Sequence, residues 1–319
     1  MSGKAQRILQ KHKDNVLFEK VQIVQLGAMH KVQKDGKFML SVPGRSGQFE
    51  ARMNSVRATS ETDYVWMGEL ADSLGSVTLV SEKGMIRGHF AIGPDQYEIS
   101  PLEGGKHTLV KLDNKKLSGR GCDESPKIKP VPNPKPKGAG GRQDACLSQG
   151  DQVVRILVLF TDRALVADPN VVQTCQLAIA QLNQAFQNSQ FGHRSAVVAA
   201  IRQFNLPVED PNNAVNNLNA FRNFSAAERA ASQADLAVLI TGNYDGGSDG
   251  VAFTDLQANN NVFADAVVAV GSATSTFVFT HEVGHLLGGN HQNCTNLITT
   301  NCSNTSTYNN GYAFTTGGS

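Results

Sequence analysis

The 319-residue sequence contains no long apolar run. A helix that crosses a bilayer needs about 20 consecutive apolar residues, whereas the apolar stretches here, such as residues 196–201, have the length of a strand. Residues 1–14 are polar and charged, so no signal peptide is visible. The sequence therefore excludes a membrane-spanning helix, and an exported form would have its leader removed or encoded upstream.

The composition lacks the marks of a disordered or fibrous chain. Hydrophobic residues make up 40% and charged residues 18% of the sequence, and its 30 glycines and 11 prolines are close to ordinary usage. No internal repeat is visible. At about 150 residues per domain, a chain of this length is expected to form two domains.

Lysine is absent after Lys137, and the two halves differ in charge. Residues 1–142 hold 23 Lys and Arg against 15 Asp and Glu, whereas residues 143–319 hold 6 against 13. This switch predicts a domain boundary, and the opposite charges favour docking of one half on the other, although unrelated drift in composition explains them too. The lysines are scattered, which gives no indication of nucleic-acid binding.

Cysteines are few and unevenly placed. Cys122 lies in the basic half, and the acidic half holds four cysteines, which are Cys146, Cys175, Cys294 and Cys302. Four cysteines suffice for two disulfides, with Cys294 and Cys302 as a short-loop pair, and leave one thiol over. Such pairing predicts an oxidising compartment and hence a secreted or extracellular protein.

The basic half ends in a linker. Between Tyr64 and Leu112, apolar residues alternate at strand spacing and are separated by turns, which predicts an antiparallel β domain. Residues 127–142 are rich in proline, lysine and glycine and favour an extended backbone that buries no core. Lys137 or Arg142 is a candidate processing site, with a plain spacer as the alternative.

After the linker, the pattern alternates between strands and helices. This alternation predicts a mostly parallel five-stranded sheet covered by helices. The expected strands are residues 153–160, 196–204, 236–241, 251–254 and 266–271, and the expected helices are residues 169–191 and 274–287.

The second of these helices carries the sequence HEVGHLLGGNH, from His281 to His291. Histidines at i and i+4, His281 and His285, share one helix face and can bind one zinc ion. Gly288 allows the chain to leave the helix, so that His291 returns as third ligand and water keeps the fourth position. Glu282 lies beside the metal, where it can act as general base toward the zinc-bound water. Five fixed positions make this pattern far more specific than its first five residues alone.

From about Val153 to His291, the acidic half resembles a metzincin zinc endopeptidase of the reprolysin (adamalysin-like) branch. The resemblance rests on three segments, which are residues 234–241, 250–253 and 277–291. It implies that residues 151–319 form a metzincin catalytic domain that hydrolyses peptide bonds. It also implies that the strand of Gly250, Val251, Ala252 and Phe253 is a sheet edge on which a peptide substrate lies.

The basic half resembles a reprolysin-type propeptide in short segments between Tyr64 and Val110. The resemblance implies that residues 1–118 inhibit the enzyme until they are removed, and that the linker, residues 119–150, contains the processing site. Cys122 then acts as a zymogen switch by occupying the fourth position on zinc, with a free or intermolecularly paired cysteine as the alternative.

The sequence departs from the metzincin pattern in two places. The last methionine is Met85, so the methionine turn beneath the zinc is missing, and Gln292 stands where the adamalysin pattern has aspartate. We interpret the missing turn as C-terminal truncation rather than loss of function. The alternatives are a zinc-binding pseudoprotease or interaction module, and a zinc hydrolase that acts on a non-peptide amide.

Overall fold

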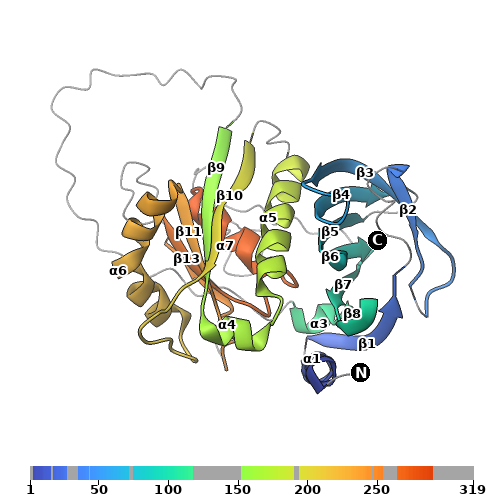
Figure 1. Cartoon of the computed structure of the whole chain (residues 1–319), viewed down its shortest axis with the longest axis horizontal. Helices are drawn as coiled ribbons and strands as arrows, with labels where there is room; N and C mark the ends of the chain where they lie inside the picture. Colours follow the sequence, from blue (N-terminus) through green and yellow to red (C-terminus); the bar gives the residue numbers. More distant parts are fainter. Residues whose placement is uncertain are drawn as a thin grey trace, which may run out of the picture.

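Two β-sheets and the helices between and around them make up the computed structural model of this chain (Figure 1). The structure describes residues 3–15, 17–26, 35–42, 44–71, 75–117, 152–189, 194–245, 248–253 and 264–289. One sheet is built from residues before the predicted linker and the other from residues after it.

The N-terminal sheet has eight strands in the order β1-β8-β7-β6-β5-β4-β3-β2, all paired antiparallel. Its strands are β1 (Phe18–Gln25), β2 (Lys37–Leu40), β3 (Phe49–Ala58), β4 (Tyr64–Leu70), β5 (Ser76–Glu82), β6 (Met85–Ile92), β7 (Asp95–Pro101) and β8 (Lys106–Leu112). Helix α1 (Gly3–Asp14) precedes β1, the 3-10 turn η2 (Glu103–Gly105) joins β7 to β8, and α3 (Asn114–Leu117) follows β8.

This sheet confirms the predicted antiparallel β domain. It also shows why apolar and polar residues alternate along the strands. Alternate residues, among them Trp66, Phe90 and Tyr97, form an apolar core on one face. The intervening residues form a second face that is buried and largely polar. Its buried polar members are Thr78, Arg87, His89, Glu98, Ser100 and Thr108, and Val80 and Val110 are buried on the same face.

The second sheet has five strands in the order β10-β9-β11-β13-β12. They are β9 (Gln152–Phe160), β10 (Arg194–Gln203), β11 (Leu236–Thr241), β12 (Gly250–Ala252) and β13 (Asp265–Ala269). Among the described strands of this sheet, only β12 runs antiparallel to its neighbour, so the predicted mostly parallel five-stranded sheet is confirmed.

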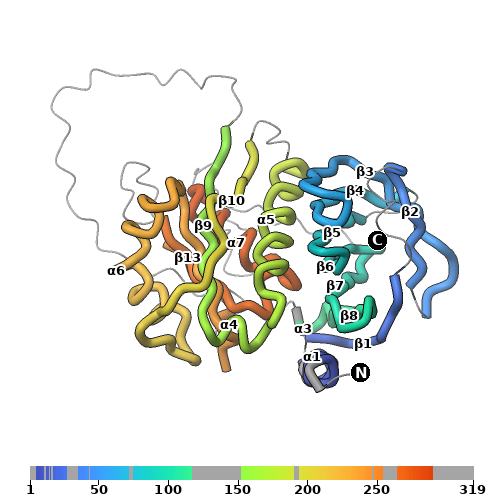
Figure 2. Tube along the Cα trace, viewed as in Figure 1, coloured from blue at the N-terminus to red at the C-terminus, as the bar shows by residue number. Residues whose placement is uncertain are grey.

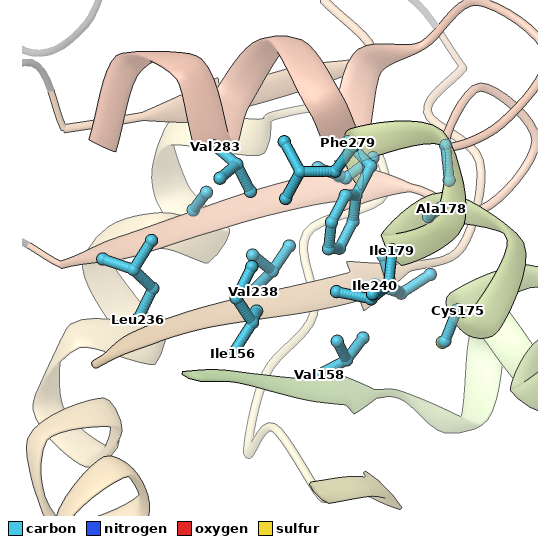
Figure 3. Packing of buried hydrophobic residues seen from close by; sticks show 14 of the residues in the cluster. Ile156, Val158, Cys175, Ala178, Ile179, Leu236, Val238, Ile240, Phe279 and Val283 are labelled. Carbon is cyan, nitrogen blue, oxygen red and sulfur yellow. The ribbon is translucent and has the colours of Figure 1, made fainter. Parts of the chain in front are cut away.

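Helices cover both faces of this sheet. Helices α5 (Val171–Asn188) and α7 (Val278–Leu286) pack on one face, and α6 (Ala214–Ser232) packs on the other (Figure 1). Figure 3 shows Phe279 and Val283 of α7 reaching toward Val238 and Ile240 of β11. The apolar stripe of α7 thus fixes the helix against the sheet.

Some boundaries differ from those that the sequence predicts. Helix α6 and the short α4 (Asp162–Ala167) were not predicted, and α5 begins two residues after Pro169. Helix α7 begins at Val278 rather than residue 274, because residues 271–277 form turns and Phe277 has a left-handed backbone (φ 58°).

Helix α5 lies between the two sheets, as the Cα trace shows (Figure 2). Its apolar side contacts the second sheet, and its polar side is buried against β4, β5 and β6. The buried polar residues of α5 are Gln173, Thr174, Gln181 and Gln184. The interface between the halves therefore contains polar side chains from both sides, which sets it apart from the two apolar cores.

Cys175 corrects one prediction. It is a free thiol, fully buried in the core beneath α5, where burial raises its pKa. The four cysteines of the acidic half therefore do not form two disulfides, because Cys175 packs as a small apolar side chain. Cys122, Cys146, Cys294 and Cys302 lie outside the described residues.

Among the described helices, none has both the length and the apolarity that a bilayer crossing requires.

Candidate active site

Helix α7 separates its side chains into three groups. Phe279 and Val283, four residues apart, are fully buried against the sheet. His281 and His285 are also four residues apart and lie on a different face of the helix from Phe279 and Val283. Glu282 is buried and lies against β12. One short helix thus anchors itself and presents two imidazoles and a carboxylate.

The two imidazoles converge. The Nε2 atoms of His281 and His285 lie 3.0 Å apart, and the rings are perpendicular with centroids 4.6 Å apart. Two nitrogens bound tetrahedrally to one zinc ion at about 2.05 Å are separated by about 3.3 Å. The pair therefore fits a zinc ion with a shift of only a few tenths of an ångström.

A hydrogen bond on the side of the ring away from His281 fixes the orientation of His285. Its Nδ1 lies 2.7 Å from the carbonyl oxygen of Gly289, which accepts only, so Nδ1 carries the proton. This leaves the lone pair of Nε2 directed toward His281. A hydrogen bond on the far ring nitrogen is the usual support of a metal-binding histidine.

Gly288 makes that hydrogen bond geometrically accessible. It adopts φ 95°, and α7 ends in a Schellman motif in which Gly288 N–H donates to His285 O and Gly289 N–H donates to Gly284 O, each at 2.9 Å. The reversal of the chain brings the Gly289 carbonyl beneath His285. A residue with a side chain resists this backbone conformation.

Glu282 is held beside strand β12. A Cβ on Gly250 would lie 2.9 Å from Glu282 Oε1 and 2.4 Å from Val278 Cγ1. Only a residue without a side chain allows α7 to approach β12 this closely. The carboxylate therefore lies directly against the last strand of the sheet.

Strand β12 pairs with β13 through Val251 and Val267 and is the last strand in the sheet order. The backbones of Asp249 and Phe253 bond to β13, so those of Gly250 and Ala252 face the opposite side. Phe253 lies beyond the strand and is buried on the α6 side, where the Arg222 guanidinium lies 5.4 Å from its ring centroid. Phe253 is therefore a core residue, whereas Gly250, Val251 and Ala252 form the edge.

The N-terminal sheet contacts the segment before α7, which the sequence does not predict. Thr274 Oγ1 donates to Glu98 Oε1 at 2.7 Å, and the rings of His89 and Phe277 meet edge to face at 4.8 Å. Burial raises the pKa of Glu98. No local pattern marks such contacts, because their partners lie far apart in the sequence.

A polar network also links the halves. Arg87 pairs with Asp168 at 2.9 Å, and Gln173 donates to the Met85 carbonyl at 3.0 Å. A cavity of about 600 Å³ lies beside this network and is lined by Arg87, Glu98 and Asp168. It does not include His281 or His285 and so is separate from the candidate active site.

The remaining predicted site residues, His291 and Cys122, lie outside the described residues. Within the described ranges, no group of three or more His, Cys, Asp or Glu side chains gathers to hold a metal. Within these ranges, His281 and His285 supply two of the nitrogen ligands that the zinc site requires. His107 of the N-terminal sheet has a structural role, since its Nε2 accepts from Ile86 N–H at 3.1 Å.

Comparison with known proteins gives similarities to metallopeptidases. Residues 172–292 match the family described as metallo-peptidase family M12B, reprolysin-like. A peptidyl-Asp metalloendopeptidase of Xanthomonas campestris pv. campestris is 25% identical over 303 residues, which cover 87% of this chain and 69% of the relative. One from Stenotrophomonas maltophilia is 26% identical over 275 residues, which cover 78% of this chain and 63% of the relative.

Another S. maltophilia protein of the same name is 27% identical over 230 residues, covering 69% of this chain and 52% of that protein. The chain thus spans between about half and just over two thirds of the length of these relatives. Metalloproteinase-II from Bacteroides fragilis is a structural neighbour with a TM-score of 0.48 and 14% identity, covering 87% of this chain and 84% of its own. Together, the family match and the three relatives show that this chain is a metallopeptidase, a hydrolase of peptide bonds.

Proposed function

We propose that the chain is a zinc-dependent endopeptidase of the reprolysin branch, with His281, His285 and His291 as zinc ligands and Glu282 as general base. The observation that carries the proposal is the convergence of His281 Nε2 and His285 Nε2 at 3.0 Å on the helix that holds Glu282 against β12. In the sequence, His291 follows the Schellman turn at Gly288 by three residues, and this turn brings the Gly289 carbonyl to His285 Nδ1.

The chemistry divides between the metal and the protein. Bound zinc supplies Lewis-acid polarisation of the scissile carbonyl and makes water acidic enough to lose a proton near neutral pH. Glu282 takes the proton of the attacking water and passes it to the leaving amine. Because Glu282 lies on a helix that packs against the sheet, its carboxylate is held in one place relative to the attacking water and the leaving amine.

The substrate is an extended peptide that lies along β12. The position of Gly250, Val251 and Ala252 at the end of the sheet supports this, since an edge strand binds an added strand through its backbone. The relatives are named for cleavage at aspartate. We infer the same preference here, and a peptide pair that differs only by Asp or Asn tests it.

The N-terminal sheet is proposed to be an inhibitory propeptide, removed after cleavage in the linker of a secreted zymogen. The polar contact between the halves, exemplified by Arg87 and Asp168, supports a separable domain, because polar interfaces release more readily than apolar cores. Cys122 is the proposed switch that occupies the fourth position on zinc in the latent form.

The test compares peptide cleavage by the linker-cleaved wild type and by Glu282→Gln, with and without a zinc chelator. Loss of the general base should reduce kcat about 10²- to 10⁴-fold while stoichiometric zinc remains. The chelator should abolish wild-type activity, and added zinc should restore it. Chelator-insensitive cleavage, or equal rates for the two proteins, contradicts the proposal. Zinc binding without cleavage of any peptide supports the pseudoprotease instead.

The uncleaved chain serves as the matched control for latency. It should be inactive, and Cys122→Ala should release activity without cleavage of the linker. An uncleaved Cys122→Ala chain that stays latent rules out the cysteine switch but leaves the zinc site untouched.

A further inference from the structure

Phe277 connects the N-terminal sheet to the first histidine of α7. It is the N-cap residue of the helix and adopts a left-handed backbone, φ 58° and ψ 23°. Its carbonyl oxygen accepts the backbone N–H of His281 at 2.9 Å. An aromatic residue is a rare occupant of this region, and such strain persists only where surrounding contacts hold it.

The contact that holds Phe277 from outside comes from His89 on β6. The two rings meet at 76° with centroids 4.8 Å apart, which is an edge-to-face arrangement. His89 is buried, and its Nε2 lies 3.4 Å from Gln96 Oε1. Burial lowers the pKa of His89 to about 4, so the ring is neutral at physiological pH.

The preceding residues of this segment are held from two sides. Thr274 Oγ1 donates to Glu98 Oε1 of the N-terminal sheet at 2.7 Å, and the Thr274 carbonyl accepts Gln181 Nε2 of α5 at 3.0 Å. Ser275 Oγ donates to the Gly271 carbonyl at 2.7 Å. Phe277 is the N-cap residue that joins this held segment to the first turn of α7.

We propose that His89 is a positioning residue for the zinc site, which acts by holding Phe277 in the backbone conformation that fixes the first turn of α7 and His281. The inference rests on the proposed zinc site and adds a contribution from the N-terminal sheet outside the cleft. It is distinct from occupation of the zinc by Cys122, since neither His89 nor Phe277 is a proposed zinc ligand.

The sign of the coupling follows from the docked structure. With the sheet in place, the Nε2 atoms of His281 and His285 are separated by 3.0 Å, close to the spacing that zinc requires. On this proposal, docking of the N-terminal sheet favours zinc binding, because it holds the first turn of α7 in the conformation in which the two rings converge. By linkage, bound zinc must strengthen docking of the sheet by the same factor.

Zinc dissociation constants of the intact chain, measured by competition with a chelator, test the inference. His89→Ala should weaken zinc binding about two- to tenfold, which is the range of one edge-to-face contact. His89→Phe keeps a ring at this position and should bind zinc as the wild type does. His107→Ala removes an equally buried imidazole from the same sheet without touching residues 271–277, and should have no effect.

A double-mutant cycle separates positioning from general destabilisation. Phe277→Gly removes the ring contact and tolerates the left-handed backbone, so His89→Ala should have no further effect on zinc affinity in that background. Equal affinities of the wild type and His89→Ala overturn the inference. An effect of His89→Ala that persists beside Phe277→Gly, or that His89→Phe fails to rescue, overturns it too. If the wild type binds no zinc, both the proposed function and this inference fail. If the wild type binds zinc but the His89 substitution does not change its affinity, only this inference fails.

Discussion

At the scale of single residues, the candidate active site depends on a glycine that is distant in sequence from the zinc-binding motif. Gly250 is the first residue of β12, and the space that a Cβ would fill is occupied by Val278 and Glu282 of α7. The motif is the basis for proposing Glu282 as the general base. It contains no information about which strand the carboxylate faces.

Gly250→Ala should therefore displace α7. The new methyl group meets Val278 Cγ1 at 2.4 Å and Glu282 Oε1 at 2.9 Å, which we expect to cost about 1–3 kcal/mol of stability. A shift of Glu282 by about 1 Å should lower kcat/KM about 100-fold. Urea unfolding and peptide cleavage measure the two effects.

The double variant Gly250→Ala, Val278→Ala separates these effects. It removes the closest clash and should recover stability, while the contact with Glu282 remains and activity stays low. Recovery of full activity in the double variant would show that the carboxylate is not held by its contact with β12.

At the scale of elements, the two ends of α7 have separate roles. Its beginning is set by Phe277, and its end by the Schellman motif at Gly288 and Gly289. The i, i+4 spacing of the histidines predicts the helix and its metal-facing side. The spacing does not predict that the Gly289 carbonyl would return to orient His285.

Gly288→Ala should weaken metal binding through this end. The left-handed backbone at φ 95° disfavours alanine by roughly 1–2 kcal/mol, so the turn should distort and release the Gly289 carbonyl from His285 Nδ1. We expect zinc affinity to fall about tenfold in a chelator titration.

Gly284→Ala is the matched control for that substitution. Gly284 lies inside α7, and a Cβ there meets no described atom within 4 Å. Alanine should raise helix stability by up to about 1 kcal/mol. Equal zinc affinities for Gly288→Ala and the wild type would indicate that His285 does not need the Gly289 carbonyl.

Helix α5 shows a different limit of sequence patterns. The apolar positions Ile179, Leu182 and Phe186 correctly predict one buried face. The opposite face reads as solvent-exposed because it carries glutamines and a threonine, yet those residues are buried against the N-terminal sheet. A helix between two layers keeps a polar side only where the second layer is polar as well.

At the scale of the whole molecule, the contact between the halves contains an acid whose ionisation opposes docking. Glu98 is buried beneath Thr274, and burial raises the pKa of its carboxyl group. Arg87 favours the charged form of Glu98, whereas Asp168 opposes it, and His12 and Asp249 line the same cavity. A raised pKa in the folded state means that folding binds a proton.

The stability that this proton contributes is present below about pH 4.5 and is lost as the pH rises through the raised pKa. Glu98→Gln keeps the acceptor for Thr274 and removes the titration. Its free energy of unfolding should therefore exceed that of the wild type by a margin that grows above pH 4.5, at up to about 1.4 kcal/mol per pH unit.

Urea unfolding from pH 4 to 9 measures this margin, with Glu103→Gln, at an exposed position, as the control. A margin that stays constant with pH would show that Glu98 is ionised in the folded chain as readily as in the unfolded one.

The amino-acid sequence by itself determined the types of the two sheets and the enzyme class. The alternation of apolar residues in the strands and the spacing of His281, Glu282 and His285 are local regularities, which the geometry of the backbone translates directly into strands and a helix face. For this reason the sheet types and the metallopeptidase class could be predicted without a structure.

Only the tertiary structure decided which distant residues meet. The contacts of Gly250 with Glu282 and of His89 with Phe277, and the burial of Cys175 as a free thiol, all depend on how layers pack. Packing is a property of complementary shapes and charges between elements far apart in the chain, and no short-range period records it.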